Sequence, residues 1–165
     1  RRRAWSAAAQ VVDPEIPVLT IADLGVLRDV AVHDGHVEVA ITPTYSGCPA
    51  TDRLMGAIRD TLTAHGYGPV HITLQLDPAW TTDWMTEAAR EKLRAYGIAP
   101  PVDGTAADGV LAGRVSRLMG NNLTIQCPRC GSTHTQKVSQ FGSTPCKASY
   151  RCADCLEPFD YFKCI

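Results

Sequence analysis

The chain ends in two Cys-X-X-Cys pairs, Cys127-Pro128-Arg129-Cys130 and Cys152-Ala153-Asp154-Cys155, separated by 21 residues. Each pair can point two sulfurs to one side, and a second pair folded against the first completes a set of four ligands. Thiolates favour zinc or an iron-sulfur centre, and four sulfurs suit either. The spacing therefore predicts a metal centre of four thiolates, with zinc the usual ion in a ribbon of this form.

Disulfide pairing in a secreted protein is the alternative for these cysteines. The chain has seven cysteines, an odd number, and six of them follow residue 126. A disulfide scaffold would spread its cysteines through the chain, so metal binding is favoured. Two cysteines remain outside the simplest set, Cys146 and Cys164. We expect them to pack near the metal, or to serve as additional ligands, with His134 a weaker competitor.

Cys48 lies apart from the ribbon, in Tyr45-Ser46-Gly47-Cys48-Pro49-Ala50-Thr51. This segment directly precedes a predicted helix, and Pro49 suits the first helical position. Amide groups and the helix dipole would favour a thiolate there, which makes a better nucleophile or metal ligand. The alternative is a buried small apolar residue, as most lone cysteines are.

Three carboxylates lie in loops ahead of the first predicted strand. Asp13-Pro14-Glu15-Ile16-Pro17 holds two of them in a restricted backbone, and Asp23 follows in Ala22-Asp23-Leu24-Gly25. They could support a site. Capping and turn hydrogen bonds by Asp13, Glu15 and Asp23 are an equally good interpretation.

Hydrophobic patterning predicts the elements that must position these residues. Strands are expected over 26–32 and 36–42, joined by a turn at His33-Asp34-Gly35. Apolar residues four apart predict a helix over about 50–64. The alternation at 70–76 predicts a third strand, and Thr82 or Asp83 can begin a helix that ends at Tyr96-Gly97.

An amphipathic helix at the N-terminus completes the order α-β-β-α-β-α, which indicates a small α/β sandwich with one mixed sheet and helices on one face. This domain is expected over 1–97. Prolines and glycines over 98–122 predict a linker, and 123–165 form the zinc ribbon. A segment of about forty residues rarely builds a sufficient core alone, so the ribbon should depend on its metal.

Composition excludes several classes of protein. The formal net charge is −1 and the pI is about 6.6, which disfavours nucleic-acid binding. No window approaches the roughly 18 apolar residues of a membrane span. The short apolar stretch after Arg1-Arg2-Arg3 fits a helix better than an export signal. We expect a cytoplasmic, reducing location, and the missing initiator Met suggests a trimmed or tagged start.

Aromatic and imidazole side chains predict no separate site. His33, His36, His65 and His71 lack the spacing of a ligand pair on one helix, so all four are interpreted as structural or solvent-facing. Trp80 and Trp84 are expected at the core and its rim. Phe159, Tyr161 and Phe162 are expected to pack the core of the ribbon or to dock it against the first domain, and an exposed aromatic edge would suit a partner.

The loop motifs taken together resemble a known family. Asp13-Pro14-Glu15-Ile16-Pro17, Asp23-Leu24-Gly25 and the run over 42–49, Thr-Pro-Thr-Tyr-Ser-Gly-Cys-Pro, are similar to the iron-sulfur assembly family over about residues 5–97. In the ribbon, the segments 141–148, 150–152 and 155–164 resemble the PaaD-type phenylacetate-degradation proteins. The resemblance spans nearly the whole chain.

This resemblance implies a compact α/β fold in which Cys48 holds or passes an iron-sulfur cluster. It implies an accessory protein for the assembly or maturation of the metal centres, iron-sulfur or di-iron, of ring-1,2-phenylacetyl-CoA epoxidase, whose subunits would be its partners. One cysteine is far short of four thiolates. A homodimer would bring two copies of Cys48 together, or Cys146 and Cys164 would contribute.

Three other functions compete with this one. The chain could be a stoichiometric structural subunit of the epoxidase that docks through its ribbon. It could be a nucleic-acid-binding ribbon, which its charge disfavours. Independent catalysis is not expected, because no nucleophile elbow, phosphate-binding glycine loop or HExxH motif occurs.

Overall fold

The computed structural model describes residues 1–102 and 124–163. Its internal contacts divide the chain into two compact units. The first unit comprises Arg1–Trp80 and Trp84–Thr86, and the second comprises Thr81–Asp83 and the described residues from Glu87 on.

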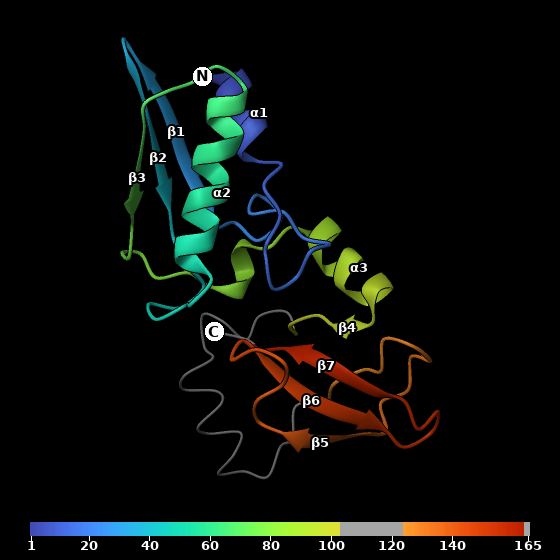
Figure 1. Ribbon diagram of the computed structural model, residues 1–165. Helices are drawn as coiled ribbons and strands as arrows, with labels where there is room; N and C mark the ends of the chain where they lie inside the picture. The colour runs from blue at the N-terminus through green and yellow to red at the C-terminus, as the bar shows by residue number, and fades with distance from the viewer. Residues whose placement is uncertain (103–123, 164–165) are drawn as a thin grey trace. The chain divides into compact units, whose positions relative to one another are not determined.

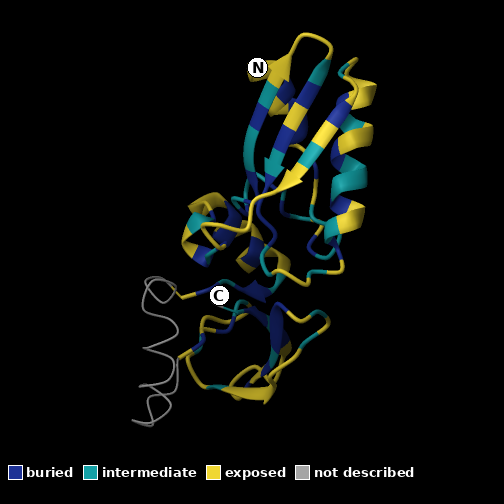
Figure 2. Cartoon of the chain, turned by 90° about the vertical axis from the view of Figure 1, so that its left-hand side faces the viewer, coloured by how far each residue is buried: buried dark blue, intermediate teal, exposed yellow. Residues whose placement is uncertain are grey.

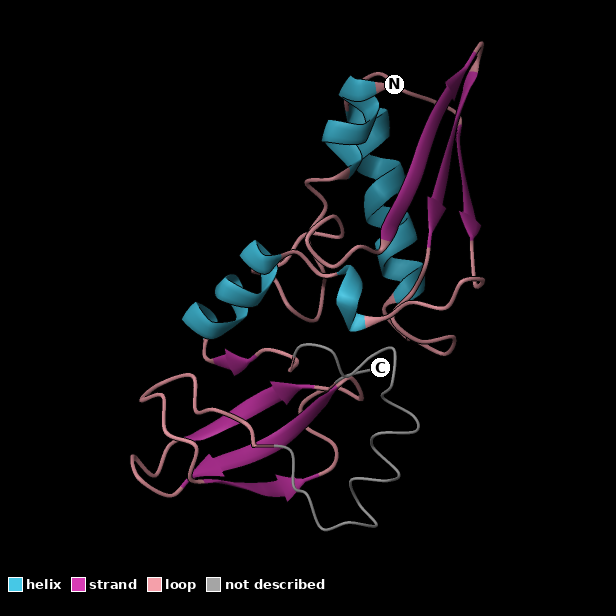
Figure 3. Ribbon diagram, turned by 180° about the vertical axis from the view of Figure 1, so that it is seen from behind, coloured by secondary structure: helices cyan, strands magenta, loops and turns pink. Residues whose placement is uncertain are grey.

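The first unit is a three-stranded sheet covered by two helices. Its elements are α1 (Arg2–Ala8), β1 (Leu27–His33), β2 (His36–Ile41), α2 (Thr51–Ala64) and β3 (Val70–Leu74). The strand order is β1-β2-β3, with β1 and β2 antiparallel and β2 and β3 parallel. Both helices lie on the same face of the sheet (Figures 1 and 3). The predicted mixed sheet with helices on one face is confirmed.

Side-chain alternation explains this layering. Along β2 the residues Val37, Val39 and Ile41 are buried, whereas the residues between them are at least partly exposed. Strand side chains alternate between faces, so one face of β2 meets the helices and the other meets solvent. Leu54, Ile58 and Leu62 of α2 form the facing stripe. Figure 2 shows the same division between buried and exposed residues along these elements.

The second unit combines a helix with a four-stranded sheet. It contains α3 (Glu87–Tyr96), β4 (Ile98–Ala99), β5 (Thr135–Ser139), β6 (Lys147–Cys152) and β7 (Pro158–Phe162). The strand order is β4-β7-β6-β5, in which only the β4–β7 pair is parallel. A short 3₁₀ turn, η1 (Thr82–Trp84), lies at the division between the units.

The predicted domain division differs from these units in the placement of α3. The predicted boundary at residue 97 assigns this helix to the first domain, whereas the contacts group it with the ribbon. The reason is nonlocal: β4 follows α3 directly and pairs with β7. Buried Arg90 also donates hydrogen bonds to the carbonyls of Pro101 (2.7 Å) and Thr82 (3.2 Å). The predicted linker therefore begins with a strand of the ribbon sheet, and its remainder from residue 103 lies outside the described residues.

In the described ranges 1–102 and 124–163, no helix is both long enough and apolar enough to cross a membrane.

Candidate metal centre and reactive cysteine

The structure brings four cysteine sulfurs together in the second unit. The Sγ atoms of Cys127, Cys130, Cys152 and Cys155 all lie within 4.8 Å of one another. Cys127 Sγ is 3.8 Å from Cys155 Sγ, and Cys130 Sγ is 3.6 Å from Cys152 Sγ. Sulfurs on a tetrahedral zinc ion are about 3.8 Å apart, because each Zn–S bond is about 2.3 Å. The donor set and its spacing fit zinc.

The sulfurs are not paired as disulfides. The structure joins none of Cys127, Cys130, Cys152 and Cys155 in a disulfide. Sulfur separations of 3.6 Å and 3.8 Å are far from the roughly 2.0 Å of a disulfide bond. The disulfide alternative is therefore not supported within the described residues.

The two Cys-X-X-Cys turns have the same backbone hydrogen bonds. The amide of Cys127 donates to the carbonyl of Ser132 (2.8 Å), five residues later. The amide of Cys152 donates to the carbonyl of Glu157 (3.0 Å), again five residues later. This repeated turn holds the two sulfurs of each pair on the same side of the turn. Two short segments can therefore form one cluster of four sulfurs.

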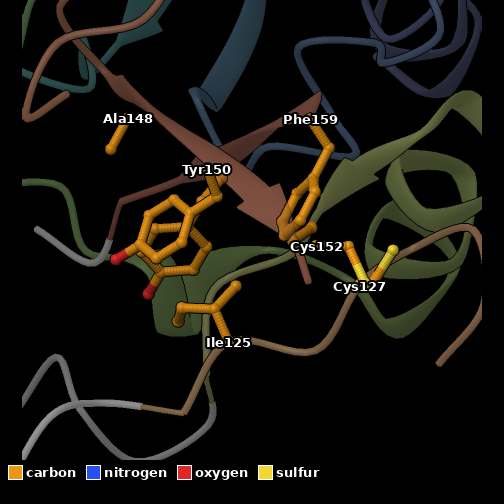
Figure 4. Close-up of a cluster of buried hydrophobic side chains, with 8 residues drawn as sticks. Ile125, Cys127, Ala148, Tyr150, Cys152 and Phe159 are labelled. Carbon is orange, nitrogen blue, oxygen red and sulfur yellow. The ribbon is translucent and has the colours of Figure 1, made fainter. Parts of the chain in front are cut away.

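The first sulfur of each turn faces the core of the ribbon. Cys127 and Cys152 are 2% and 0% exposed, while Cys130 and Cys155 are exposed. Figure 4 shows Cys127 and Cys152 beside Phe159 at one end of an apolar cluster. The whole cluster comprises Ala99, Ile125, Cys127, Ala148, Tyr150, Cys152, Phe159 and Tyr161. A metal held here would tie two surface turns to the core that β4, β6 and β7 provide.

The pKa values of Cys152 and Cys130 shift in opposite directions. The backbone N–H of Cys155 lowers the pKa of Cys152 to about 7. The backbone N–H of Ser132 lowers the pKa of Cys130, but desolvation and the three neighbouring thiols outweigh it and raise that pKa to about 12. Four thiols at this separation cannot all ionise without a compensating cation, so the cluster suits a metal that displaces protons.

A polar contact links the two turns on their outer side. The Ser132 hydroxyl donates a hydrogen bond to the Asp154 carboxylate, and His134 Nδ1 lies 3.3 Å from the same carboxylate. These two contacts, the hydroxyl first, lower the pKa of Asp154. His134 thus lies against Asp154 and is not among the clustered ligand atoms that the structure describes.

Cys146 is buried and lies outside the four-sulfur cluster. Its Sγ is 3.0 Å from the Thr144 hydroxyl, and its carbonyl accepts a hydrogen bond from the amide of Lys163 (3.0 Å). These contacts fit the packing role that was one of its two predicted roles. Cys164, the other additional candidate, lies outside the described residues.

The loop that precedes Cys146 converges on Asp160 of β7. The Ser143 hydroxyl donates to Asp160 Oδ2 (3.0 Å), and the buried Lys147 ammonium lies 3.6 Å from the same oxygen. A Cβ on Gly142 would lie 2.8 Å from Asp160 Oδ1. Contacts around the ion pair of Lys147 and Asp160 therefore explain several residues of the motif over 141–148.

Cys48 lies in the turns that lead into α2. Its amide donates to the carbonyl of Tyr45 (3.2 Å), and its carbonyl accepts from the amide of Thr51 (3.1 Å). The thiol is free and the residue is partly exposed. The helix begins at Thr51 with Ala50 as its N-cap, so Pro49 lies just outside the helix and not at its first position. Cys48 is therefore not a fully buried residue, unlike a typical core cysteine.

The acidic loop residues make local backbone contacts. Asp13 Oδ1 accepts hydrogen bonds from the amides of Glu15 and Ile16, both at 2.8 Å. Asp23 Oδ2 accepts from the amide of Thr20 (2.9 Å), whose hydroxyl accepts from the amide of Asp23 (3.1 Å). This reciprocal pair is the capping-box arrangement. The contacts favour the structural interpretation of Asp13 and Asp23; Glu15 is partly buried, and its role stays a prediction.

Gly25 completes the Asp-Leu-Gly motif for a steric reason. It has a positive φ of 69°, and a Cβ there would lie 2.6 Å from the carbonyl oxygen of Trp84. Next to it, the buried Trp80 ring donates from Nε1 to the carbonyl of Leu24 (2.8 Å). Trp80 is therefore a core residue, as expected.

The histidines include a group that the sequence interpretation missed. His33 and His36 lie on either side of the β1–β2 turn, and both Nε2 atoms approach the carboxylate of Glu38. The i, i+2 spacing of His36 and Glu38 on a predicted strand was the available signal. Strand pairing adds His33 to this group, because it places His33 opposite His36.

Comparison with known proteins identifies both parts of the chain. The family model of the PaaD zinc beta ribbon domain matches residues 112–163, and the model of the iron-sulfur cluster assembly protein matches residues 1–67. Among solved structures, a DUF59 domain of unknown function from Bacillus anthracis has a TM-score of 0.52 and 22% identity. The match covers 56% of this chain and 89% of that one, and it supports the fold of this part.

A full-length relative covers both parts. This Escherichia coli (strain K12) protein, named as one subunit of a "Putative 1,2-phenylacetyl-CoA epoxidase", is 55% identical over 161 residues, which is 98% of this chain and 91% of the relative. This identity, together with the four clustered cysteines in a zinc ribbon and the mixed α/β sheet, places the chain: it belongs to the PaaD family, in which an iron-sulfur assembly domain precedes a zinc ribbon.

Proposed function

We propose that this protein is an accessory factor that assembles or matures a metal centre, iron-sulfur or di-iron, of phenylacetyl-CoA epoxidase. The relative that matches almost the whole chain is named as a subunit of that enzyme. The first part of the chain matches an iron-sulfur cluster assembly domain. Its partners would be the other epoxidase subunits, in the reducing cytoplasm where free thiols persist.

The observation that carries this proposal is that two kinds of thiol site lie in different compact units, a cluster of four sulfurs in one and a single cysteine in the other. Cys127, Cys130, Cys152 and Cys155 would hold a structural zinc ion that crosslinks two turns of the ribbon. Cys48 belongs to the other compact unit and is partly exposed. A metal-transfer thiol must be accessible to a recipient, because the recipient's thiolate replaces it as a ligand without any change in oxidation state.

The test is to load the protein with iron and sulfide under anaerobic conditions. Wild type should acquire iron that Cys48→Ser does not, while zinc per chain stays equal in both. Cys146→Ser is the matched control, since it also removes one thiol but lies outside the proposed transfer site. A Cys48→Ser variant that loads iron and supports epoxidase maturation as well as wild type would contradict the proposal.

A second candidate function is a stoichiometric structural subunit that docks through the ribbon. Three large apolar side chains of the ribbon favour it: Val138, Phe141 and Leu156 are 67%, 65% and 60% exposed. Exposed apolar side chains are used in protein interfaces. Stable co-elution with the catalytic subunits in a fixed ratio would support this function, whereas transient contact and catalysis of maturation at substoichiometric amounts would support the accessory factor.

A further inference from the structure

We propose that His33, His36 and Glu38 form a second metal site, which takes a divalent first-row transition cation and is independent of the ribbon cysteines. One ligand atom from each residue lies within 4.8 Å of the other two. All three residues belong to the first compact unit, whereas the ribbon cysteines belong to the second. The site is separate from the proposed transfer role of Cys48.

Strand register places these side chains on one face. His33 of β1 pairs with His36 of β2 across the Asp34-Gly35 turn. Glu38 is two residues after His36, so its side chain points to the same side of β2, opposite the buried face of Val37 and Val39. The hairpin turn of β1 and β2 stands at the far end of the sheet from the start of α2 (Figure 1). The backbone thus gathers two imidazoles and a carboxylate on an accessible surface.

The separations match a metal site better than a pair of hydrogen bonds. His33 Nε2 is 3.4 Å from Glu38 Oε2, and His36 Nε2 is 3.5 Å from Glu38 Oε1. Hydrogen bonds between nitrogen and oxygen are usually about 2.7–3.2 Å, so both contacts are long. Ligands on a tetrahedral ion with bonds of about 2.0–2.1 Å are about 3.3 Å apart. Both nitrogen-to-carboxylate separations are therefore close to that spacing, and the ligand atoms of the two histidines lie within 4.8 Å of each other.

The imidazole rings at this site lie close together. The rings of His33 and His36 stack with their centroids 4.8 Å apart at an interplanar angle of 19°. The ring of His71 meets that of His36 edge to face at 5.5 Å, and His71 pairs with Glu38 in the β2–β3 register. A third imidazole is therefore adjacent to the site.

The donor chemistry selects the class of cation. Two imidazoles and one carboxylate suit zinc, iron(II), nickel or copper, and disfavour magnesium and calcium, which prefer oxygen ligands. The side chains of His33, His36 and Glu38 are 47%, 34% and 57% exposed. Such an open site leaves coordination positions to water and exchanges its ion, in contrast to the closed set of four thiolates in the ribbon.

The test is equilibrium dialysis of the zinc-loaded full chain against Zn²⁺. Wild type should hold one equivalent beyond the ribbon zinc. The double variant His33→Gln/His36→Gln should lose this equivalent, whereas His65→Gln, which changes an exposed histidine outside the group, should keep it. Cys48→Ser should also keep it. Loss in Cys48→Ser with retention in the double variant would assign the ion to the thiol and overturn the proposal.

A measurement on wild type avoids dependence on the variants. Paramagnetic Ni²⁺ should broaden the amide NMR signals of residues 33–38 and 71 before any others, and Mg²⁺ at the same concentration should leave them unchanged. Broadening centred elsewhere, or no second equivalent of zinc at all, would show that the group is only a set of surface imidazole-carboxylate contacts.

Discussion

Gly131 and Leu156 occupy the same position in the two metal-binding turns, and both have left-handed backbone. Each follows the second cysteine of its Cys-X-X-Cys pair, with φ of 75° at Gly131 and 62° at Leu156. Of the non-glycine residues that the structure describes, Leu156 alone has a positive φ. The fold of the turn requires this conformation at both places, but the sequence supplies glycine only once.

Leu156→Gly should therefore stabilise the zinc-loaded ribbon. A non-glycine residue in the left-handed region costs roughly 1–2 kcal/mol, and glycine avoids this cost. Glycine loses more conformational entropy on folding, which offsets about 0.5–1 kcal/mol of the gain. The expected gain is up to about 1 kcal/mol, since the 60% exposed leucine side chain buries little. Gly131→Ala should have the opposite sign. Unfolding followed by the absorption of Co²⁺ in the ribbon measures both, and equal destabilisation by the two changes would contradict the expectation.

The ribbon should lose its metal when a clustered cysteine is changed, but not when Cys146 is changed. Cys130→Ser removes one of the four clustered sulfurs, whereas Cys146→Ser alters a buried thiol outside the cluster. Structural zinc contributes about 10–16 kcal/mol in small metal domains, so the first change should also unfold the ribbon. Metal analysis and Co²⁺ absorption report the loss.

Tryptophan fluorescence is the control for this experiment. Trp5, Trp80 and Trp84 all belong to the first unit, so their emission should stay the same in both variants. Full zinc content in Cys130→Ser, or loss of zinc in Cys146→Ser, would require a different ligand set.

The local elements were predictable because their signals are local. The strand over 36–42, the helix over about 50–64 and the strand over 70–76 match β2, α2 and β3 within two residues at each end. Alternation and four-residue spacing depend only on which face is buried. The four clustered cysteines were predictable as well, because the spacing of two Cys-X-X-Cys pairs is itself typical of a metal site.

The missed features depend on pairing between distant segments. The two-residue β4 has no pattern of its own, and its place in the ribbon sheet follows from its parallel partner β7. The group of His33, His36 and Glu38 likewise needs the strand register, because the spacing alone does not fit one helix face. The sequence does not decide whether Asp13 and Asp23 support a functional site or cap turns of the backbone. Their hydrogen bonds to backbone amides favour capping.

Lys147 and Asp160 should behave as a coupled pair, with Lys147 buried and Asp160 partly buried. Their side chains are 6% and 24% exposed, and they lie 3.6 Å apart. Asp160→Asn would leave a buried ammonium without its counter-charge, which costs about 3–5 kcal/mol. Lys147→Met in the same chain should recover most of that loss, because the unpaired charge is removed. The free energies of unfolding of the single and double variants give the coupling energy between the two side chains. Additive changes in the free energy of unfolding would contradict the coupling.

Gly25→Ala should destabilise the first unit more than Gly35→Ala does. Both glycines have positive φ, 69° and 95°, so each substitution carries a strain of about 1 kcal/mol. Only Gly25 adds a clash: its Cβ would lie 2.6 Å from the backbone oxygen of Trp84, while nothing lies within 4 Å of a Cβ at Gly35. Backbone cannot move aside as a flexible side chain can. The difference between the two variants, measured by unfolding with tryptophan emission, isolates the cost of that contact, and equal losses would mean that strain alone keeps glycine at position 25.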